Sequence, residues 1–149
     1  DWSWSRGLGD VYKRQNAERY GFSMIRDFNR GTVGWTDWNL LLDQTGGPNH
    51  VSNFCFAPIH GDTSTGELIY TPTYYYIGHF SKFVGPDSVR ISTSVSRNVV
   101  LATSFLNPDG TMATIVMNKS NDSINYSFFL NDRQVDLKIP PRAMQTLVY

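Results

Sequence analysis

The segment Trp35-Thr36-Asp37-Trp38-Asn39 carries side chains that could bind a sugar. An indole can stack on the apolar face of a sugar ring, and a carboxylate or amide can hold its hydroxyl groups. In an extended chain Trp35 and Asp37 share one face and Trp38 lies on the other. At the carboxyl end of a barrel-type strand, such residues would face the mouth of a site. The alternative is that one or both tryptophans pack in the core, as aromatic side chains commonly do.

The acidic residues do not supply a convincing catalytic pair. Hydrolysis of a glycosidic bond by two carboxylates needs an acid and a nucleophile or base. The chain has two glutamates, Glu18 in a predicted helix and Glu67 in a Thr-Gly-Glu-Leu turn, and neither follows a predicted strand. Asp37 is the only acid in the candidate strand, and its default interpretation is a structural, hydrogen-bonded group. We therefore assign no catalytic residue.

The histidines and the cysteine do not predict a metal site. His50, His60 and His79 follow no spacing typical of metal ligands. Surface or hydrogen-bonded histidines are the better interpretation. Cys55 lies between two phenylalanines, which favours an inert buried thiol over a nucleophile. We expect neither a metal nor a cofactor.

Composition excludes several classes of protein. The 149 residues include 13 Lys+Arg and 13 Asp+Glu, with no basic stripe, so we expect no nucleic acid partner. One cysteine cannot form an internal disulfide. No apolar run approaches the ~20 residues of a membrane span. The chain does not begin with Met, so the lack of a leader leaves the localisation undetermined.

The first half predicts two helices around one strand. Residues 1–15 fit nothing that follows, so we interpret them as foreign sequence or a frayed terminus. The first predicted helix covers 16–30, with Asn16 as its cap and Gly31 at its end. A predicted strand over 32–39 and a loop over 43–71 follow. The second predicted helix covers 71–84, with Thr71 as its cap and Pro72 at its first position.

After Gly85-Pro86 the pattern changes to alternation with a period of two. Short alternating runs separated by turn residues predict an antiparallel sheet or sandwich. The predicted strands cover 88–96, 98–106, 111–119, 123–130, 133–139 and 143–149. The first half, with one strand, cannot close a parallel sheet alone, so it is interpreted as a piece of something larger.

Three longer blocks resemble a known family. They are GWTDWNLLLDQTGGPNHVSNFCFAPI at 34–59, YYYIGHFSKFVGPDSVRI at 74–91 and NPDGTMATIVMNKS at 107–120. They resemble the C-terminal part of glycoside hydrolase family 30, nearest to its glucosylceramidase (acid β-glucosidase) group. The resemblance covers about residues 16–149, and residues 1–15 depart from it.

The resemblance implies a fold of two incomplete parts, one α/β and one all-β. Residues 16–84 would be the last helix–strand–helix part of a (β/α)₈ TIM barrel, and residues 85–149 most of an antiparallel β-sandwich packed on it. In this family the sandwich also takes strands from before the barrel. Residues 1–15 form a separate, non-family segment in this division.

The resemblance also implies a chemistry. Family members are retaining β-glycosidases that use two glutamates, which would both lie upstream of Asn16, so this fragment alone is expected to be inactive. The implied substrate is a β-glucoside or a glycolipid such as glucosylceramide, and the implied partner is the missing N-terminal half of the barrel. Extracellular, periplasmic or lysosome-like locations fit the family. The implied substrate-binding residues are Trp38, Asn53, Asp37 and Phe54, of which Trp38 matches the tryptophan that walls the glucose subsite and Asn53 an asparagine of the same pocket.

A second hypothesis stays open. The chain could be a free-standing β-sandwich module that binds carbohydrate or another protein without catalysis. The aromatic segment before the sandwich favours the glycosidase fragment, because such a module has no use for a lone barrel strand. An unpaired strand would leave backbone groups unsatisfied. We therefore expect the chain alone to unfold with poor cooperativity or to aggregate.

Overall fold

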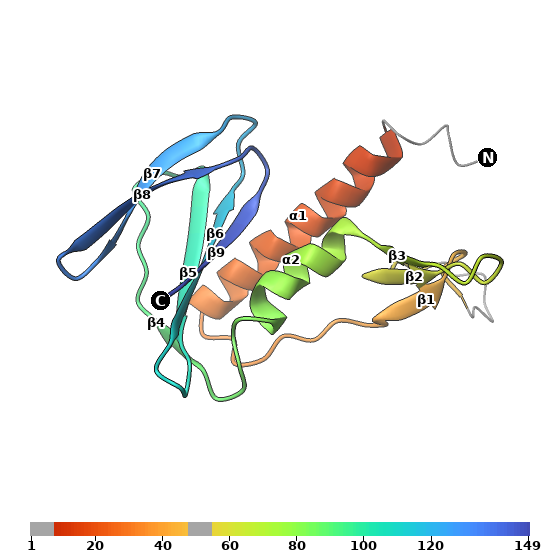
Figure 1. Cartoon of the computed structure of the whole chain (residues 1–149), viewed down its shortest axis with the longest axis horizontal. Coiled ribbons are helices and arrows are strands. Elements are labelled where there is room, and N and C mark those ends of the chain that lie inside the picture. Colours follow the sequence, from red (N-terminus) through yellow and green to blue (C-terminus); the bar gives the residue numbers. More distant parts are fainter. Residues whose placement is uncertain (1–7, 48–54) are drawn as a thin grey trace. The chain divides into compact units, whose positions relative to one another are not determined.

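The computed structural model describes residues 8–47 and 55–149, which fall into two compact units. The first unit holds the chain up to Tyr20 together with Val33–Ile77, and the second holds Gly21–Thr32 together with Gly78–Tyr149. Two helices, α1 (Leu8–Asn29) and α2 (Pro72–Ser81), contribute residues to both units (Figure 1).

Helix α1 starts earlier than predicted and ends where predicted. It begins at Leu8, so the prediction of a start capped by Asn16 is wrong, because the helical backbone continues through residues 8–15. At its end Gly31 adopts a φ of 99°. The amide of Gly31 donates to the carbonyl of Phe28, and the amide of Thr32 donates to that of Asp27. These two bonds form a Schellman motif, in which glycine tolerates the left-handed conformation.

The first unit contains a three-stranded sheet where a long loop was predicted. β1 (Leu41–Asp43) pairs in parallel with β2 (Ile59–Gly61), and β2 pairs antiparallel with β3 (Leu68–Tyr70). The Asp62 carboxylate closes the turn between β2 and β3 by accepting from the amide and hydroxyl of Ser64. The glycine and asparagine content of this stretch predicts a loop, whereas the structure has three strands of three residues each.

The predicted strand over 32–39 is wrong, because these residues form no regular strand in the structure. A β-strand is held by hydrogen bonds to a neighbouring strand, and no strand of the described residues pairs with this segment. Its aromatic and β-branched composition suits a strand, but composition cannot supply the neighbours. The partial barrel therefore consists of helices and a small sheet, without a closed barrel.

Helix α2 begins at Pro72 as predicted and ends at Ser81, three residues short of the prediction. Proline suits this first position because its missing N–H would be unpaired there anyway. Thr71 acts differently from the predicted cap: its hydroxyl donates to the carbonyl oxygens of Ala57 and Pro58, at 3.4 and 3.0 Å. Thr71 therefore ties the helix start to the preceding segment.

The second unit contains the predicted antiparallel strands in two sheets. The larger sheet has the order β4 (Val89–Ile91), β5 (Val100–Leu106), β6 (Met112–Asn118) and β9 (Met144–Val148), and the smaller is the hairpin of β7 (Ile124–Leu130) and β8 (Arg133–Ile139). Strand β4 ends at Ile91, so the predicted strand over 88–96 is too long. Residues 92–96 are one valine among serines and a threonine, so this stretch has little apolar surface to bury.

The central strands of the larger sheet are buried on both faces. On one face, Val100, Ala102 and Val116 form a cluster with Ile124 and Ile139 of the hairpin. On the other face, the Phe105 ring meets the Phe28 ring edge-on at 5.4 Å, and Phe28 stacks on Phe80 at 5.6 Å. This arrangement explains why β6 is a nearly continuous apolar run rather than an alternating one.

Candidate functional site

The two tryptophans of the aromatic segment, residues 35–39 of the first unit, have different surroundings. The Trp35 ring meets the Tyr20 ring of α1 edge-on, with 5.6 Å between centroids. The Tyr20 hydroxyl donates a hydrogen bond to Oδ1 of Asp37 over 3.2 Å. Trp38 is 81% exposed. Trp35 and Asp37 thus share one neighbour, Tyr20, as residues predicted on one face would, and the placement of Trp38 on the opposite face stays a prediction.

The environment of Tyr20 favours its neutral form. Burial raises the pKa of Tyr20, and the negative charge and hydrogen bond of Asp37 raise it further. Tyr20 thus stays a hydrogen-bond donor to Asp37 at neutral pH. Asp37 is itself exposed and keeps acceptor capacity on its second oxygen, Oδ2. An exposed indole and an exposed carboxylate one residue apart could stack on and hydrogen-bond to a sugar.

Two other predicted binding residues, Asn53 and Phe54, lie outside the described residues, as does His50. The described turn just before them is ordered by Asp43. Its Oδ1 accepts from the amide and hydroxyl of Thr45 and from the amide of Gly47, and these bonds lower the pKa of Asp43. The roles of Asn53 and Phe54 stay predictions.

The described histidines have structural hydrogen bonds, as predicted. His60 Nδ1 lies 2.8 Å from the Asp43 carbonyl oxygen, and its Nε2 accepts from the Ala57 amide at 3.3 Å, a pattern that fits the neutral ring protonated at Nδ1. His79 Nδ1 lies 2.8 Å from the Thr146 hydroxyl, and burial lowers the pKa of His79. Among the described residues, no three potential metal ligands gather.

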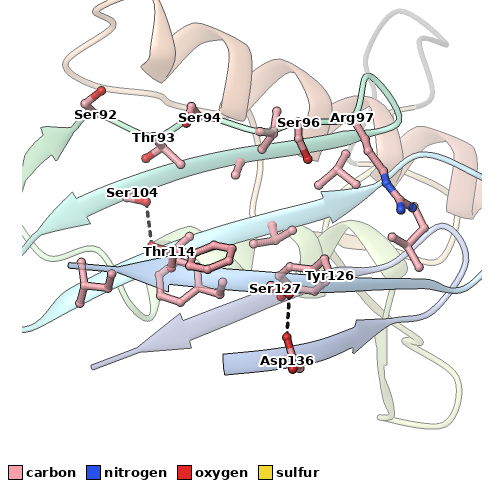
Figure 2. Close-up of a pocket in the computed structure, with 18 of the residues that line it drawn as sticks. Ser92, Thr93, Ser94, Ser96, Arg97, Ser104, Thr114, Tyr126, Ser127 and Asp136 are labelled. Carbon is pink, nitrogen blue, oxygen red and sulfur yellow. Dashed lines mark hydrogen bonds between the residues drawn. The ribbon is translucent and has the colours of Figure 1, made fainter. Parts of the chain in front are cut away.

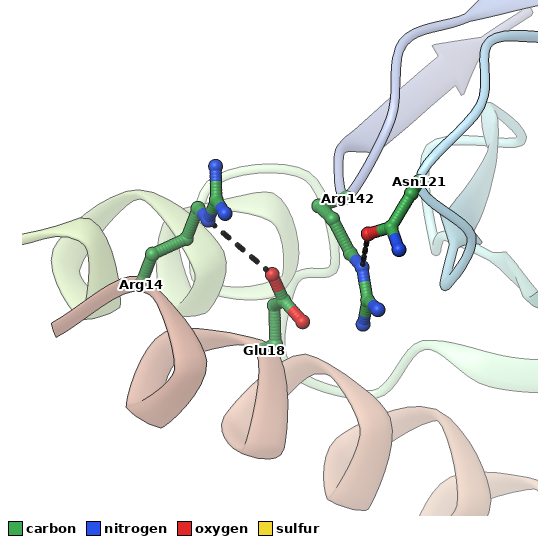
Figure 3. Close-up of polar contacts among 4 residues, drawn as sticks. All are labelled: Arg14, Glu18, Asn121 and Arg142. Carbon is green, nitrogen blue, oxygen red and sulfur yellow. Dashed lines mark hydrogen bonds and ion pairs between the residues drawn. The ribbon is translucent and has the colours of Figure 1, made fainter. Parts of the chain in front are cut away.

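The two glutamates lie on separate elements. Glu18 lies on α1 and forms an ion pair of 3.6 Å with Arg14, one turn earlier on the same helix (Figure 3). Glu67 is exposed in the turn before β3. Neither geometry suggests a catalytic acid. Figure 3 also shows a polar contact of the second unit, in which Arg142 Nε donates to Asn121 Oδ1 over 3.0 Å.

The second unit has a groove that the sequence did not predict. Its volume is about 740 Å³, and it is lined by strands of both sheets and by residues 91–97 (Figure 2). Its floor includes the core residues Val100, Ala102, Val116 and Ile124. These side chains are buried between the two sheets, so the groove runs along the core of this unit.

Several polar groups along the groove already bond to one another. The hydroxyls of Ser104 and Thr114 lie 2.7 Å apart, and Thr114 also bonds to the Tyr149 hydroxyl at 2.8 Å. Ser127 donates to Asp136 across the hairpin at 2.6 Å (Figure 2). These hydroxyls are already paired and the apolar floor is buried, so this part of the groove offers a sugar few of the free polar groups that binding needs.

Along the chain, part of a barrel domain is followed by an antiparallel β-sandwich, which defines a two-domain α/β plus all-β class of protein. The sequence model of the glycosyl hydrolase family 30 TIM-barrel domain matches residues 5–84, and that of the family 30 β-sandwich domain matches residues 87–147. The chain therefore belongs to glycosyl hydrolase family 30.

Individual proteins agree with this membership. Lysosomal acid glucosylceramidase of Mus musculus is 37% identical over 123 residues, which cover 82% of this chain and 22% of the mouse protein. The crystal structure of SrfJ from Salmonella typhimurium matches with a TM-score of 0.91 and 33% identity, over 97% of this chain and 32% of that chain. The endo-β1,6-glucanase BT3312 matches with a TM-score of 0.76 and 28% identity, over 86% of this chain and 30% of that chain.

The chain spans only about a quarter of the length of its curated relatives, between 22% and 28% for the first three. Of the described residues, no helix combines the length and apolar character that crossing a membrane requires.

Proposed function

We propose that this chain is the carboxyl-terminal part of a retaining β-glycosidase that hydrolyses β-glucosidic bonds, with glucosylceramide-like glycolipids or simpler β-glucosides as substrates. Its catalytic glutamates would belong to the part of the protein upstream of Asn16. The chain itself would supply substrate-binding groups, namely Trp38, Asp37, Asn53 and Phe54.

One observation carries the proposal: Trp38 is 81% exposed beside the exposed Asp37, in a segment that matches the family's barrel domain. Exposing a large indole to water is costly unless something covers it. A sugar ring of a bound substrate would cover it and would find a carboxylate next to it. The glucosylceramidase relatives support the glucoside as the sugar.

The test begins with the coding sequence upstream of Asn16. We expect an open reading frame that encodes further barrel strands, with two glutamates at strand ends. The longer protein should hydrolyse p-nitrophenyl β-glucoside and glucosylceramide, whereas residues 1–149 alone should not. Trp38→Ala in the longer protein should lower kcat/KM by about tenfold or more, equivalent to roughly 1.4 kcal/mol. Hydrolysis by the short chain alone would contradict the proposed division of labour.

The rest of the same protein is the partner that this proposal requires. The groove of about 740 Å³, with its apolar floor, is a surface that upstream strands would cover. The longer protein should therefore bind less of a hydrophobic dye than the short chain, and the short chain should aggregate or unfold with poor cooperativity. A sharp two-state melt of a soluble 149-residue monomer would count against this expectation.

The second candidate is a non-catalytic β-sandwich module. Aromatic side chains along the same groove, such as the Phe128–Tyr149 pair at 5.3 Å, would then contact the carbohydrate. A stop codon directly upstream, together with binding of the short chain to an immobilised polysaccharide, would favour this alternative.

A further inference from the structure

Tyr20 is the side chain that joins α1 to the aromatic segment within the first unit. Its hydroxyl donates to Asp37 Oδ1 at 3.2 Å, and its ring receives the Trp35 ring edge-on at 5.6 Å with an interplanar angle of 66°. One residue thus holds two positions of the segment, one by a hydrogen bond and one by an aromatic contact. Trp38, the residue after Asp37, is 81% exposed.

These contacts matter because the backbone of the segment has no strand partner. Among the described residues, none of the strands pairs with 33–39. A ladder of backbone hydrogen bonds would normally fix which side chains face which way. In this segment, hydrogen bonds and ring contacts of side chains must fix these orientations instead. Tyr20 makes a ring contact with Trp35 and a hydrogen bond with Asp37.

The hydrogen bond also leaves a defined part of the carboxylate free. A carboxylate has two oxygens, each with acceptor capacity. Tyr20 engages Oδ1 of Asp37, and Asp37 is exposed, so Oδ2 can accept from a hydroxyl group of a ligand. The neutral phenol cannot repel that carboxylate, so the donor stays in place while a ligand binds.

We propose that Tyr20 is a positioning residue for sugar binding: its hydroxyl orients the Asp37 carboxylate toward a sugar hydroxyl, and its contact with Trp35 presents Trp38 to the sugar ring. This inference rests on the proposed function, because it concerns the same binding residues. It adds a residue of α1 that no spacing argument had connected to the aromatic segment.

The first experiment tests the contact in the longer protein. Tyrosine ionisation is followed by ultraviolet absorbance in the parent, Tyr20→Phe, Asp37→Asn and the control Tyr75→Phe. Tyr75 is 60% exposed and contacts Tyr74. Asp37→Asn should shift one late-titrating tyrosine toward lower pH, and Tyr20→Phe should remove that same transition. Identical titrations of the parent and Asp37→Asn would overturn the contact.

The second experiment tests the role in the longer, active protein. Tyr20→Phe keeps the ring and removes one donor, so it should raise KM and the inhibition constant of glucose about three- to tenfold, as expected for one hydrogen bond, with a smaller change in kcat. Asp37→Asn should have an effect of similar kind, and the double variant should cost less than the sum of the two, because both act through one contact. Tyr75→Phe should match the parent.

The outcomes separate the two hypotheses. A longer protein that hydrolyses no β-glycoside contradicts the proposed function and the positioning role together. An active longer protein in which Tyr20→Phe leaves KM and inhibitor binding unchanged, or in which the two substitutions are fully additive, contradicts the positioning role alone. Circular dichroism of each variant confirms that the fold is kept.

Discussion

Strand β6 of the second unit and residues 33–39 of the first are both seven residues long, and both suit a β conformation by composition. β6 pairs with β5 on one side and β9 on the other, and six of its seven residues are buried. Residues 33–39 pair with no described strand, and all but Trp35 are exposed. The comparison teaches that strand formation depends on neighbours, which β6 has within the second unit and residues 33–39 do not have among the described residues.

Strands β6 and β3 should differ most in how much one isoleucine contributes to stability, because that of β6 is buried and that of β3 is exposed. Ile115→Ala in β6 removes a side chain that is 0% exposed, so it should lower the free energy of unfolding by about 3–4 kcal/mol. Ile69→Ala in β3, where the side chain is 37% exposed, should cost less than about 1 kcal/mol. Urea unfolding of the longer protein, followed by circular dichroism, measures both. Equal losses would break the comparison.

The first unit should nevertheless be sensitive at one tight backbone contact. Gly46 has a φ of 86°, and a Cβ there would lie 2.5 Å from the carbonyl oxygen of Cys55. Gly46→Ala should destabilise the chain by about 2 kcal/mol or more, through strain and the clash. The matched control is Gly66→Ala, where φ is 76° but nothing lies within 4 Å, and a cost near 1 kcal/mol is expected. Thermal unfolding ranks the two, and the reverse order would contradict the described packing.

Two neighbouring hydroxyls of β5 should respond in opposite directions. Thr103 is fully buried, and its hydroxyl has no hydrogen-bond partner, whereas Ser104 bonds to Thr114 at 2.7 Å. Thr103→Val should be neutral or stabilising by up to about 1 kcal/mol, because it removes an unpaired polar group. Ser104→Ala should destabilise by a similar amount, since it leaves Thr114 with one partner fewer. Denaturant midpoints of both variants test this, and a large loss for Thr103→Val would reveal a partner.

The smallest expected effect is a pH dependence centred on His79. Burial lowers the pKa of His79 in the folded state below its unfolded value, so the folded state binds its proton less readily. Stability should therefore be full above the unfolded pKa, about 6.5, and decline as the pH falls below it toward the lower folded pKa. His79→Gln should flatten this part of the stability curve relative to the parent. An unchanged slope would assign the pH dependence to other groups.

Local chemistry made several features predictable. Gly31 ends α1 with a positive φ, Pro72 starts α2, and the Asn131-Asp132 turn closes the β7–β8 hairpin with Asn131 at a φ of 51°. Each depends on the conformational range of one or two residues. The early start of α1 and the short strands β1 to β3 escaped prediction, because weakly patterned or very short elements carry little periodicity to detect.

The candidate site also has features that the sequence predicted and features that it did not. The residue types at 35–39 and their alternation predicted which side chains lie together, and the structure confirms that Trp35 and Asp37 share Tyr20 while Trp38 is exposed. Tyr20 itself is 15 and 17 positions away from those two residues, and it contributes only an apolar position to the helical pattern. No local rule connects such distant positions, so its contact with the segment required the tertiary structure.

The sequence by itself determined the family, the turn positions and the alternating strands of the second unit, because these depend on residue type and short-range spacing, and it predicts sugar binding by the aromatic segment. The tertiary structure decided that residues 33–39 form no strand, that β6 is buried on both faces, that a groove lies between the two sheets of the second unit, and that Tyr20 holds Asp37. These depend on which distant parts of the chain meet, since pairing and burial are made between segments rather than within them.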